Sequence, residues 1–373
     1  MEKQNKRKLV FLFGAGISKS AGLPLGNELT EKLLNTDKYY IYGKDYKWDE
    51  NPPMGTNYST KEHDAIKFIY DYLKNNGEPN PNYERIYYLA ELAALYSIKM
   101  DSENKDLQKE FPLRPELYPF FKTLPVSDKP IYEFYSSVCN YIQQFICKEL
   151  NIAFDMEKAS SDLSVIIDSC KDNFFDEIII FTLNHDILLE SLFGYNKIAY
   201  NDGFSFNCED KFYHWDYSQF KDTSKVKLIK LHGSIYWYKN SKNKLINEIN
   251  GHDSTSLEFA WPMSYYPIFL TGTDNKYFNY THSHFLEMLN YLYETLYNTE
   301  VLFISGYGFC DHGINNLIFN AQINSDLSVF NVAKSIPNTV ILIEDEEYNK
   351  TRKYIEDFKI VELKELYLRN RNQ

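Results

Sequence analysis

The sequence predicts an α/β protein: a Rossmann-like, doubly wound parallel sheet that carries a helical insertion. Short apolar runs, each ending abruptly at small or polar residues, alternate with segments in which apolar residues recur every three or four positions. The first run leads directly into a glycine turn, Gly14-Ala15-Gly16. Strands that alternate with helices form parallel sheets with right-handed crossovers, so these observations together favour the doubly wound class.

The first strand is expected at Lys8–Phe13, whose nearly continuous apolar character is typical of a central strand buried on both faces. A helix is expected at 27–34. Residues 37–58 are rich in Tyr, Asp, Asn, Pro and Gly, which predicts an irregular excursion. Helical spacing then recurs over 63–74, 83–100, 131–152 and 163–170.

Apolar runs at 177–182, 226–231, 300–305 and 339–343 predict four later strands, with helices at 283–297 and 311–321. The sequence therefore predicts one Rossmann-like core from residues 1–36 and 176–373. Residues 37–175 form a mainly helical insertion in that prediction.

The composition limits the binding partners and the cellular compartment that we expect for the protein. The net charge of the 373-residue chain is -12, and clustered basic residues are needed to bind nucleic acid, so no direct nucleic-acid partner is expected. No apolar run approaches the roughly 20 residues of a membrane helix, and the chain starts without a secretory leader. The five cysteines include no C-x-x-C pair. We expect a cytoplasmic protein with reduced cysteines and no membrane contact.

The glycine turn after the first strand is a candidate phosphate site. Glycines let the backbone approach a diphosphate closely, and free N–H groups at a helix start favour its charge. The third glycine of the dinucleotide fingerprint is missing, because Lys19 stands in its place. A strand–turn–helix without any ligand is the alternative.

Three other strands also end in polar or small residues: Asn184-His185-Asp186, His232-Gly233-Ser234 and Ser305-Gly306. In an open parallel sheet, ligands bind beyond the carboxyl ends of the strands. Each group has a structural alternative. Asn184 and Asp186 could cap a helix that begins near residue 187, His232 could be a structural histidine, and Asp311 is favoured as a helix N-cap.

The order of these motifs resembles the sirtuin-like superfamily of NAD-consuming Rossmann proteins. Gly14-Ala15-Gly16-Ile17-Ser18 with Ala21-Gly22-Leu23-Pro24 is similar to the first family motif, and Thr182-Leu183-Asn184-His185-Asp186 to its T-x-N-x-D motif. Leu231-His232-Gly233 resembles the catalytic H-G, and Ser305-Gly306 stands where the family binds the adenosine end of NAD. No motif covers the insertion at 37–175.

Two departures separate this chain from the deacylating sirtuins. Pro24-Leu25-Gly26-Asn27 replaces their Asp-Phe-Arg run, and both zinc-binding C-x-x-C pairs are missing. The pattern is closer to the zinc-free sirtuin-like effectors of bacterial antiphage defence, which resemble NAD glycohydrolases. The resemblance therefore implies an NAD hydrolase with NAD as substrate, no zinc and no other metal.

The resemblance also implies roles for individual residues. Asn184 would hold the ribose or the attacking water, Asp186 would anchor the nicotinamide carboxamide, and His232 would be the general base. Gly14, Ala15, Gly16 and Ser18 would contact the diphosphate, and Ser305 with Gly306 the adenosine end. The effect of His185 between Asn184 and Asp186 is not predicted.

Other functions and partners stay open at this point. The same loops could bind NAD or ADP-ribose as a non-catalytic sensor, or serve protein ADP-ribosylation or deacylation. By resemblance, partners include a HerA-type ATPase or another defence-system subunit, and a homo-oligomer with an aromatic-rich interface on the insertion. The His282-x-His284 pair and the acidic run 344–347 are expected to be structural.

Overall fold

The computed structural model describes residues 6–43, 45–48, 52–54, 56–101, 120, 124, 130–209, 212–239, 244–247, 267–270, 283–325, 327–333 and 354–371. The chain divides into two compact units. The sheet unit comprises Met1–Leu25, Leu150–Leu270 and Tyr277–Gln373, and the helical unit is built on Gly26–Glu149. The predicted strand-end residues all fall in the sheet unit.

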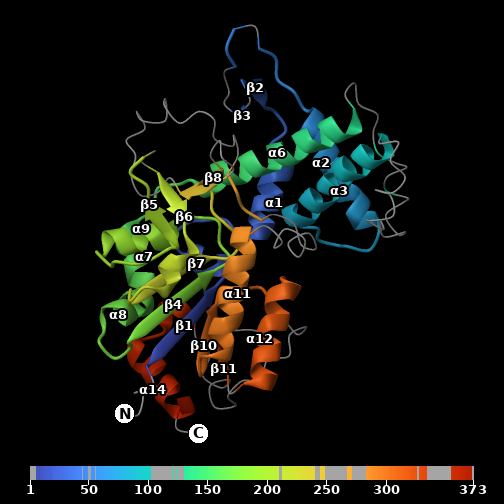
Figure 1. The fold of residues 1–373 in the computed structure, drawn as a ribbon. Helices are drawn as coiled ribbons and strands as arrows, with labels where there is room; N and C mark the ends of the chain where they lie inside the picture. The colour runs from blue at the N-terminus through green and yellow to red at the C-terminus, as the bar shows by residue number, and fades with distance from the viewer. Residues whose placement is uncertain are drawn as a thin grey trace. The chain divides into compact units, whose positions relative to one another are not determined.

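The sheet unit contains a five-stranded parallel sheet in the order β11-β10-β1-β4-β7 (Figure 1). Its strands are β1 (Lys8–Phe13), β4 (Glu177–Thr182), β7 (Val226–Lys230), β10 (Val301–Ser305) and β11 (Ser328–Asn331). The chain runs from β1 outward through β4 to β7 and then returns to the other side of β1. This reversal makes the carboxyl end of β1 the topological switch point, where ligands bind in such sheets.

The strand register brings the carboxyl ends level. Phe13 of β1 pairs with Thr182 of β4 on one side and with Ser305 of β10 on the other. Thr182 in turn pairs with Lys230 of β7. The residues that follow these four strands therefore leave the sheet at one edge, although they are far apart in the sequence.

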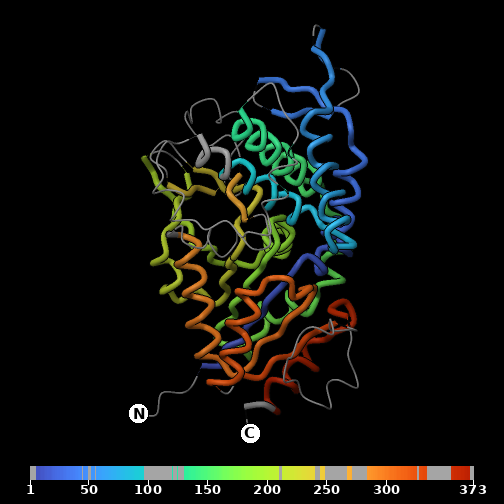
Figure 2. The backbone as a smooth tube through the Cα atoms, turned by 90° about the vertical axis from the view of Figure 1, so that its right-hand side faces the viewer, coloured from blue at the N-terminus to red at the C-terminus, as the bar shows by residue number. Residues whose placement is uncertain are grey.

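Alternate side chains of the strands face two different layers. One set, including Val10, Ile179 and Leu302, packs with α11 (Ser283–Tyr297) and α12 (His312–Asn324) in a single apolar cluster. The two helices contact each other and lie side by side in both views (Figure 2). On the opposite face Phe303 contacts Phe358, which precedes α14 (Ile360–Arg371). Helices on both faces confirm the doubly wound class.

Shorter elements complete the sheet unit. They are η1 (Ala15–Ser18), α7 (Met156–Asp162), α8 (Ser164–Lys171), α9 (Leu188–Tyr195), η3 (Tyr217–Lys221) and η5 (Ile355–Asp357). A second, antiparallel sheet has the order β5-β6-β9-β8 and comprises Phe204–Phe206, Tyr213–Trp215, Leu245–Asn247 and Trp237–Lys239. This second sheet was not predicted, because each strand has only three residues and shows no period.

The helical unit contains α1 (Gly26–Asn35), α2 (Lys61–Asn75), α3 (Tyr83–Asp101) and α6 (Ile131–Leu150), with a hairpin of β2 (Tyr40–Tyr42) and β3 (Asp45–Lys47). A buried carboxylate organises its centre. Glu62 accepts hydrogen bonds from the hydroxyls of Tyr39 and Ser137, the latter at 2.9 Å. These donors offset the cost of removing the carboxylate from water.

The strands predicted at 8–13, 177–182, 226–231 and 300–305 are confirmed to within one residue. The four predicted helices of the insertion are also present, with α7 as an addition. Strand β11 was missed because only two of its four residues, Val329 and Phe330, are apolar. The strand predicted at 339–343 and the acidic run 344–347 lie outside the described residues. Within the described helices, none is long and apolar enough to cross a membrane.

Candidate site at the carboxyl ends of the parallel strands

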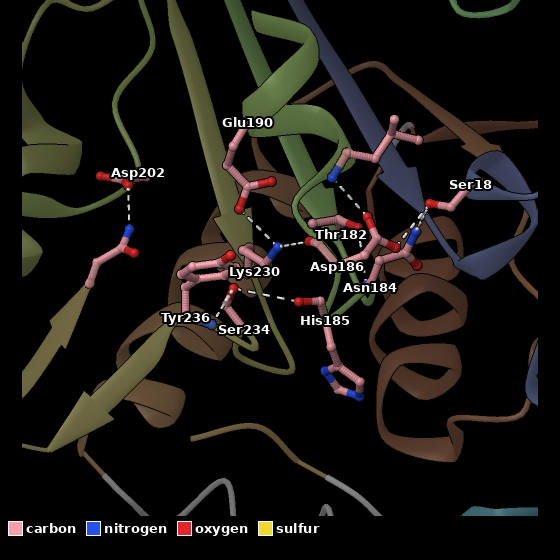
Figure 3. A network of polar contacts seen from close by, with 12 residues as sticks. Ser18, Thr182, Asn184, His185, Asp186, Glu190, Asp202, Lys230, Ser234 and Tyr236 are labelled. Carbon is pink, nitrogen blue, oxygen red and sulfur yellow. Dashed lines mark hydrogen bonds and ion pairs between the residues drawn. The ribbon is translucent and has the colours of Figure 1, made fainter. Parts of the chain in front are cut away.

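Three polar side chains from the segments that follow β1 and β4 meet at the switch point (Figure 3). The Asn184 amide donates from Nδ2 to the Ser18 hydroxyl at 3.0 Å, and that hydroxyl donates to Asp186 Oδ2 at 3.0 Å. All three residues are buried. The glycine turn after β1 is therefore joined to the polar segment after β4 by a chain of two hydrogen bonds.

Asp186 and Asn184 have different local roles. The second carboxylate oxygen of Asp186 accepts from the backbone N–H of Leu188 at 3.0 Å, at the start of α9. Asp186 thus bonds to the start of α9 from the residue before its N-cap, which is Ile187. Asn184 makes no such cap, since its own N–H donates to Thr182 Oγ1 at 3.1 Å and its side chain turns to Ser18.

The carbonyl oxygen of the Asn184 side chain takes part in neither of these contacts. This atom, Oδ1, is buried and has no hydrogen-bond partner among the described residues. An unpaired buried acceptor costs about 1–3 kcal/mol. A donor supplied from outside the chain, such as a ligand hydroxyl or a bound water, would satisfy it.

His232 follows the neighbouring strand and is held by an acid. The backbone N–H of Leu231 donates to the Thr182 carbonyl at 2.9 Å, which keeps the ends of β7 and β4 adjacent. The His232 imidazole Nε2 lies 3.0 Å from Asp311 Oδ2. Both side chains are more than nine-tenths buried. The pair is a buried histidine–carboxylate contact between the ends of β7 and β10.

Asp311 also caps α12, as the sequence predicted. Its Oδ1 accepts from the backbone N–H of Ile314 at 3.1 Å. Two hydrogen bonds fix the turn that precedes Asp311 to α12. Tyr307 Oη donates to Asn315 Oδ1 at 2.8 Å, and Asn315 Nδ2 donates to the Phe309 carbonyl at 2.8 Å. Phe309 itself has a left-handed backbone, with φ of 55°. Such a conformation is costly for a bulky residue and persists where its surroundings fix it.

The glycine turn packs against the turn that follows β10. A Cβ at Gly14 would lie 2.6 Å from the Gly306 carbonyl oxygen, and one at Gly16 would lie 2.6 Å from the Gly306 Cα. Gly14 N–H donates to Ser305 O at 3.0 Å, Gly16 N–H to Gly306 O at 2.9 Å, and Ile17 N–H to Gly14 O at 3.2 Å. In this conformation these three N–H groups are not available to a diphosphate.

The turn at His232-Gly233 is contacted by a second segment, residues 267–270. Leu270 N–H donates to His232 O at 2.8 Å, and Gly233 has φ of 80° with Phe269 Cα 2.8 Å from the position a Cβ would take. The Phe269 ring also lies 4.6 Å from the His185 ring, centroid to centroid. His185, whose role was not predicted, thus lies between this segment and the His232 ring, 6.2 Å away.

A buried ion pair lies next to the Asn184-His185-Asp186 segment and contacts its backbone (Figure 3). Lys230 Nζ donates to Glu190 Oε1 at 2.8 Å and to the Asp186 carbonyl oxygen. Both side chains are at most 4% exposed. Burial raises the pKa of Glu190, and the Lys230 ammonium opposes that rise. Removing either partner of such a pair leaves an uncompensated buried charge.

Of the predicted site residues, the structure brings Ser18, Asn184 and Asp186 into direct contact, and it places Gly14 and Gly16 against Gly306. Ser305 Oγ donates to the Val332 carbonyl at 2.9 Å, which ties β10 to the end of β11. Ala15 is exposed at the tip of the turn. The His232 imidazole is hydrogen-bonded to Asp311, which was not among the predicted site residues.

Three supporting residues were not predicted as part of the site. They are Asp311, as the partner of His232, and the ion-paired residues Lys230 and Glu190. The sequence carries a signal for the pair, because each charge interrupts an apolar stretch, Val226–Lys230 in one case and 187–193 in the other. A charge in such a stretch is buried only when it is paired. The contact of Asp311 has no local signal, since it depends on how β7 and β10 are placed in the sheet.

Among the described residues, no group of three or more His, Cys, Asp or Glu side chains could hold a metal ion. His284 of the predicted H-x-H pair is buried at the start of α11, and His282 lies outside the described part. The described cysteines are free thiols. Burial raises the pKa of Cys147 and Cys170 to about 12, as expected for packing residues.

Fold and site together define a Rossmann-like protein with a polar site at the switch point of its sheet. Residues 178–363 match the family of the SIR2-like domain. This match begins in β4 and covers Asn184, His232 and Asp311, and it supports a sirtuin-like family for the chain. A search of the curated proteins found no match.

Solved sirtuin structures are among the structural relatives, with weak overall similarity. A Sir2 homologue in complex with NAD is 10% identical, with a TM-score of 0.35, over 98% of this chain and 90% of that one. Sir2 in complex with an inhibitor, 2'-O-acetyl-ADP-ribose and a deacetylated p53 peptide is 12% identical, with a TM-score of 0.33, over 98% and 95%.

Proposed function

We propose that the protein is an NAD⁺ glycohydrolase that cleaves the nicotinamide N-glycosidic bond. Water attacks the anomeric carbon as the bond to nicotinamide breaks, which gives nicotinamide, ADP-ribose and a proton. The transition state resembles an oxocarbenium ion, so the site has to hold the ribose and orient the nucleophile. The SIR2-like match and the polar strand ends support this assignment.

The observation that carries the proposal is the buried carbonyl oxygen of Asn184 at the switch point, which has no hydrogen-bond partner in the ranges that the structure describes. It is an acceptor in need of a donor, and both a ribose hydroxyl and the attacking water are donors. The Ser18 hydroxyl fixes the amide so that Nδ2 is occupied and Oδ1 is presented. Asn184 is proposed to orient the ribose or the water.

His232 is proposed as the general base. Its contact with Asp311 uses Nε2, so Nδ1 is the nitrogen that takes the proton from water or a ribose hydroxyl. Asp186 is proposed to bind the nicotinamide carboxamide, and the turns at Gly14–Ser18 and Ser305–Gly306 the rest of the nucleotide. Since three N–H groups of the first turn donate within the protein, a diphosphate would be bound by other groups of that turn.

The test is to incubate the purified chain with NAD⁺ and to follow nicotinamide and ADP-ribose by chromatography. Asn184→Ala and His232→Ala should each abolish most nicotinamide release while keeping the fold. Matched controls are Asn298→Ala, whose exposed amide donates to the Glu294 carbonyl of α11, and His312→Ala at an exposed position. If both site variants released nicotinamide at the parent rate, the site assignment would be wrong.

A non-catalytic sensor of NAD or ADP-ribose is the second candidate. The observation that favours it is the internal bonding of the glycine-turn N–H groups, which leaves fewer donors for tight transition-state binding. A sensor would show an NAD-induced rise in Tm without product. ADP-ribosylation or deacylation of a protein would instead appear as a mass change on an added candidate protein.

The biological setting proposed is NAD depletion in bacterial antiphage defence, in the cytoplasm, with residues 37–175 as an insertion into the NAD-binding core. A HerA-type ATPase or another defence subunit is the proposed partner. Co-purification of the chain with such a subunit from infected and uninfected cells would test this. NAD levels that stay constant during infection of cells carrying the gene would refute the role.

We also propose that the chain self-associates. The sequence predicted an aromatic-rich interface on residues 37–175, and to that proposal we add α11 and α12 as contributors. The thirteen residues of α12 include no Lys, Arg, Asp or Glu, yet Phe319 and Ile323 are 39% and 57% exposed. Leu286 and Tyr293 are exposed on the adjoining α11. A second copy of a chain with net charge -12 is repelled by most of the protein's surface, and α12, which carries no charged side chain, is where two copies can meet.

A further inference from the structure

We propose that Asp311 is a positioning residue for His232: it selects the imidazole tautomer that acts as base and stabilises the imidazolium formed during the reaction. This inference rests on the proposed function of His232. The contact joins the ends of β7 and β10, and these two strands are separated in the sheet by β1 and β4.

The geometry is that of a charge-assisted hydrogen bond. His232 Nε2 and Asp311 Oδ2 are 3.0 Å apart, and the two side chains are 3% and 6% exposed. An ionised carboxylate only accepts hydrogen bonds, so Nε2 has to carry the proton. The neutral ring then has its lone pair on Nδ1. When Nδ1 accepts a proton, the new positive charge lies next to the carboxylate in a site with little water.

Helix capping alone does not explain this residue. Asp155 caps α7 and Asp216 caps η3 through the same kind of N–H contact, and both capping bonds are solvent-exposed. Asp311 divides its two oxygens between Ile314 N–H and the imidazole, and it is buried. Burying a carboxylate is costly unless its oxygens are well paired, and the imidazole supplies the second pair.

The turn before Asp311 keeps the carboxylate in place. Tyr307 Oη lies 3.1 Å from the Asp311 carbonyl oxygen and donates to Asn315, which in turn holds the left-handed Phe309. A strained residue maintained by its neighbours is a frequent feature of sites that need exact geometry. Here the strain lies two residues before the carboxylate that contacts the proposed base.

Asp311→Asn separates the two roles. The side-chain carbonyl of Asn can still accept from Ile314 N–H, because Asn is a good N-cap residue. Its NH₂ group then faces His232 Nε2, which has to accept instead of donating, and the imidazole proton moves to Nδ1. Asp155→Asn is the matched control, since it makes the same change at a cap that contacts no site residue.

The primary readout is the tautomer of His232, measured by NMR of the ¹⁵N-labelled imidazoles and assigned with His232→Gln. We expect the Nε2–H form in the parent protein and in Asp155→Asn, and loss of that form in Asp311→Asn with little change in Tm. For NAD⁺ hydrolysis we expect kcat to fall by about 10²–10⁴-fold and KM to change little.

The outcomes separate this inference from the proposed function. A tautomer shift in Asp311→Asn without NAD⁺ turnover in any chain would support the positioning role and reject the hydrolase. A parent protein with the Nδ1–H form would overturn the inference. Turnover by Asp311→Asn equal to that of the parent would also overturn it.

Discussion

The Asn184 side chain donates to the hydroxyl of Ser18 at 3.0 Å, across a sequence separation of 166 residues. This bond orients the Asn184 amide so that its carbonyl oxygen has no partner within the described part of the chain. Ser18 passes the interaction on to Asp186. A hydroxyl is suited to this position because it accepts from the amide and donates to the carboxylate at the same time.

Ser18→Ala should therefore weaken both stability and turnover. The change leaves Asn184 Nδ2 and Asp186 Oδ2 each without this partner, and we expect a loss of about 1–3 kcal/mol in the free energy of unfolding. A freed Asn184 amide should reduce kcat/KM for NAD⁺ by about 10–100-fold. Urea unfolding and product chromatography measure the two effects.

The control for Ser18 is Ser169→Ala. Ser169 is also buried, but its hydroxyl donates to Val165 O within α8 at 2.7 Å, far from the strand ends. It should leave kcat/KM unchanged. Equal turnover in both variants would show that the Ser18–Asn184 bond has no bearing on the site.

Gly16→Ala should destabilise the protein by about 1–3 kcal/mol, as overpacking does. The new methyl group would lie 2.6 Å from Gly306 Cα, which is backbone and cannot rotate away. Gly194→Ala in α9 is the matched control, because no atom lies within 4 Å of its Cβ position. There alanine should be neutral or stabilising, since it favours helix over glycine. The same loss in both variants would mean that the two turns do not pack as described.

Asp202 predicts an unusual pH dependence. Burial raises the pKa of this carboxyl to about 6, although Phe204 N–H at 3.1 Å and the Asn247 amide at 3.1 Å donate to it and oppose the rise. The pKa in the unfolded chain is about 3.9. Between these values the folded state binds more protons, so the free energy of unfolding falls as pH rises from about 4 to about 6.

Asp202→Asn mimics the protonated form and should remove this loss. The variant should match the parent near pH 4 and exceed it at pH 7, by up to about 3 kcal/mol. Urea unfolding at both pH values measures the difference. Asp216→Asn should act in the opposite direction, because hydrogen bonds from Ser218 lower the pKa of Asp216 and its contribution is lost as pH falls. A pH-independent difference for Asp202→Asn would contradict its raised pKa.

The proposed contact through α11 and α12 can be tested by measuring the mass of the protein in solution. Phe319→Glu combined with Ile323→Glu should convert the proposed oligomer to a smaller species, because each copy would carry two buried negative charges into the contact. Light scattering after size-exclusion chromatography measures the mass. Tyr195→Glu, an exposed position on α9, is the control. A parent chain that is monomeric at all concentrations, or a variant of unchanged mass, would rule out this interface.

The strands and their common edge were predictable because the signal is local. An apolar run such as Lys8–Phe13 can only be satisfied by burial on both faces, and the residue at which each run ends is visible in the sequence. Ser18, Asn184 and His232 were singled out for that reason. The strand register is not encoded locally, because it depends on how separate strands pair. In a parallel sheet the strand ends nevertheless fall at the same edge, as Phe13, Thr182, Lys230 and Ser305 do.

The sequence could not indicate the hydrogen-bond partner of each polar group. Asp311 has the appearance of any N-cap, and its contact with His232 arises only once β10 and β7 are in the same sheet. The glycine turn was expected to offer its N–H groups to a diphosphate, whereas Gly14 and Gly16 donate theirs to the Ser305 and Gly306 carbonyls, and Ile17 donates within the turn. The same residue pattern serves either purpose, and only the approach of a distant backbone decides between them.

The order of the strands also has a consequence for synthesis. β1 is made first but occupies the middle of the sheet, and its partner β10 comes late, shortly before Asp311. While the chain is still on the ribosome, one edge of β1 stays unpaired and His232 lacks its carboxylate. The NAD⁺ glycohydrolase proposed above would harm its own producer if it became active during translation. With this topology, a nascent chain cannot complete the site until most of it has been made, and a chain truncated before Val301 should release no nicotinamide.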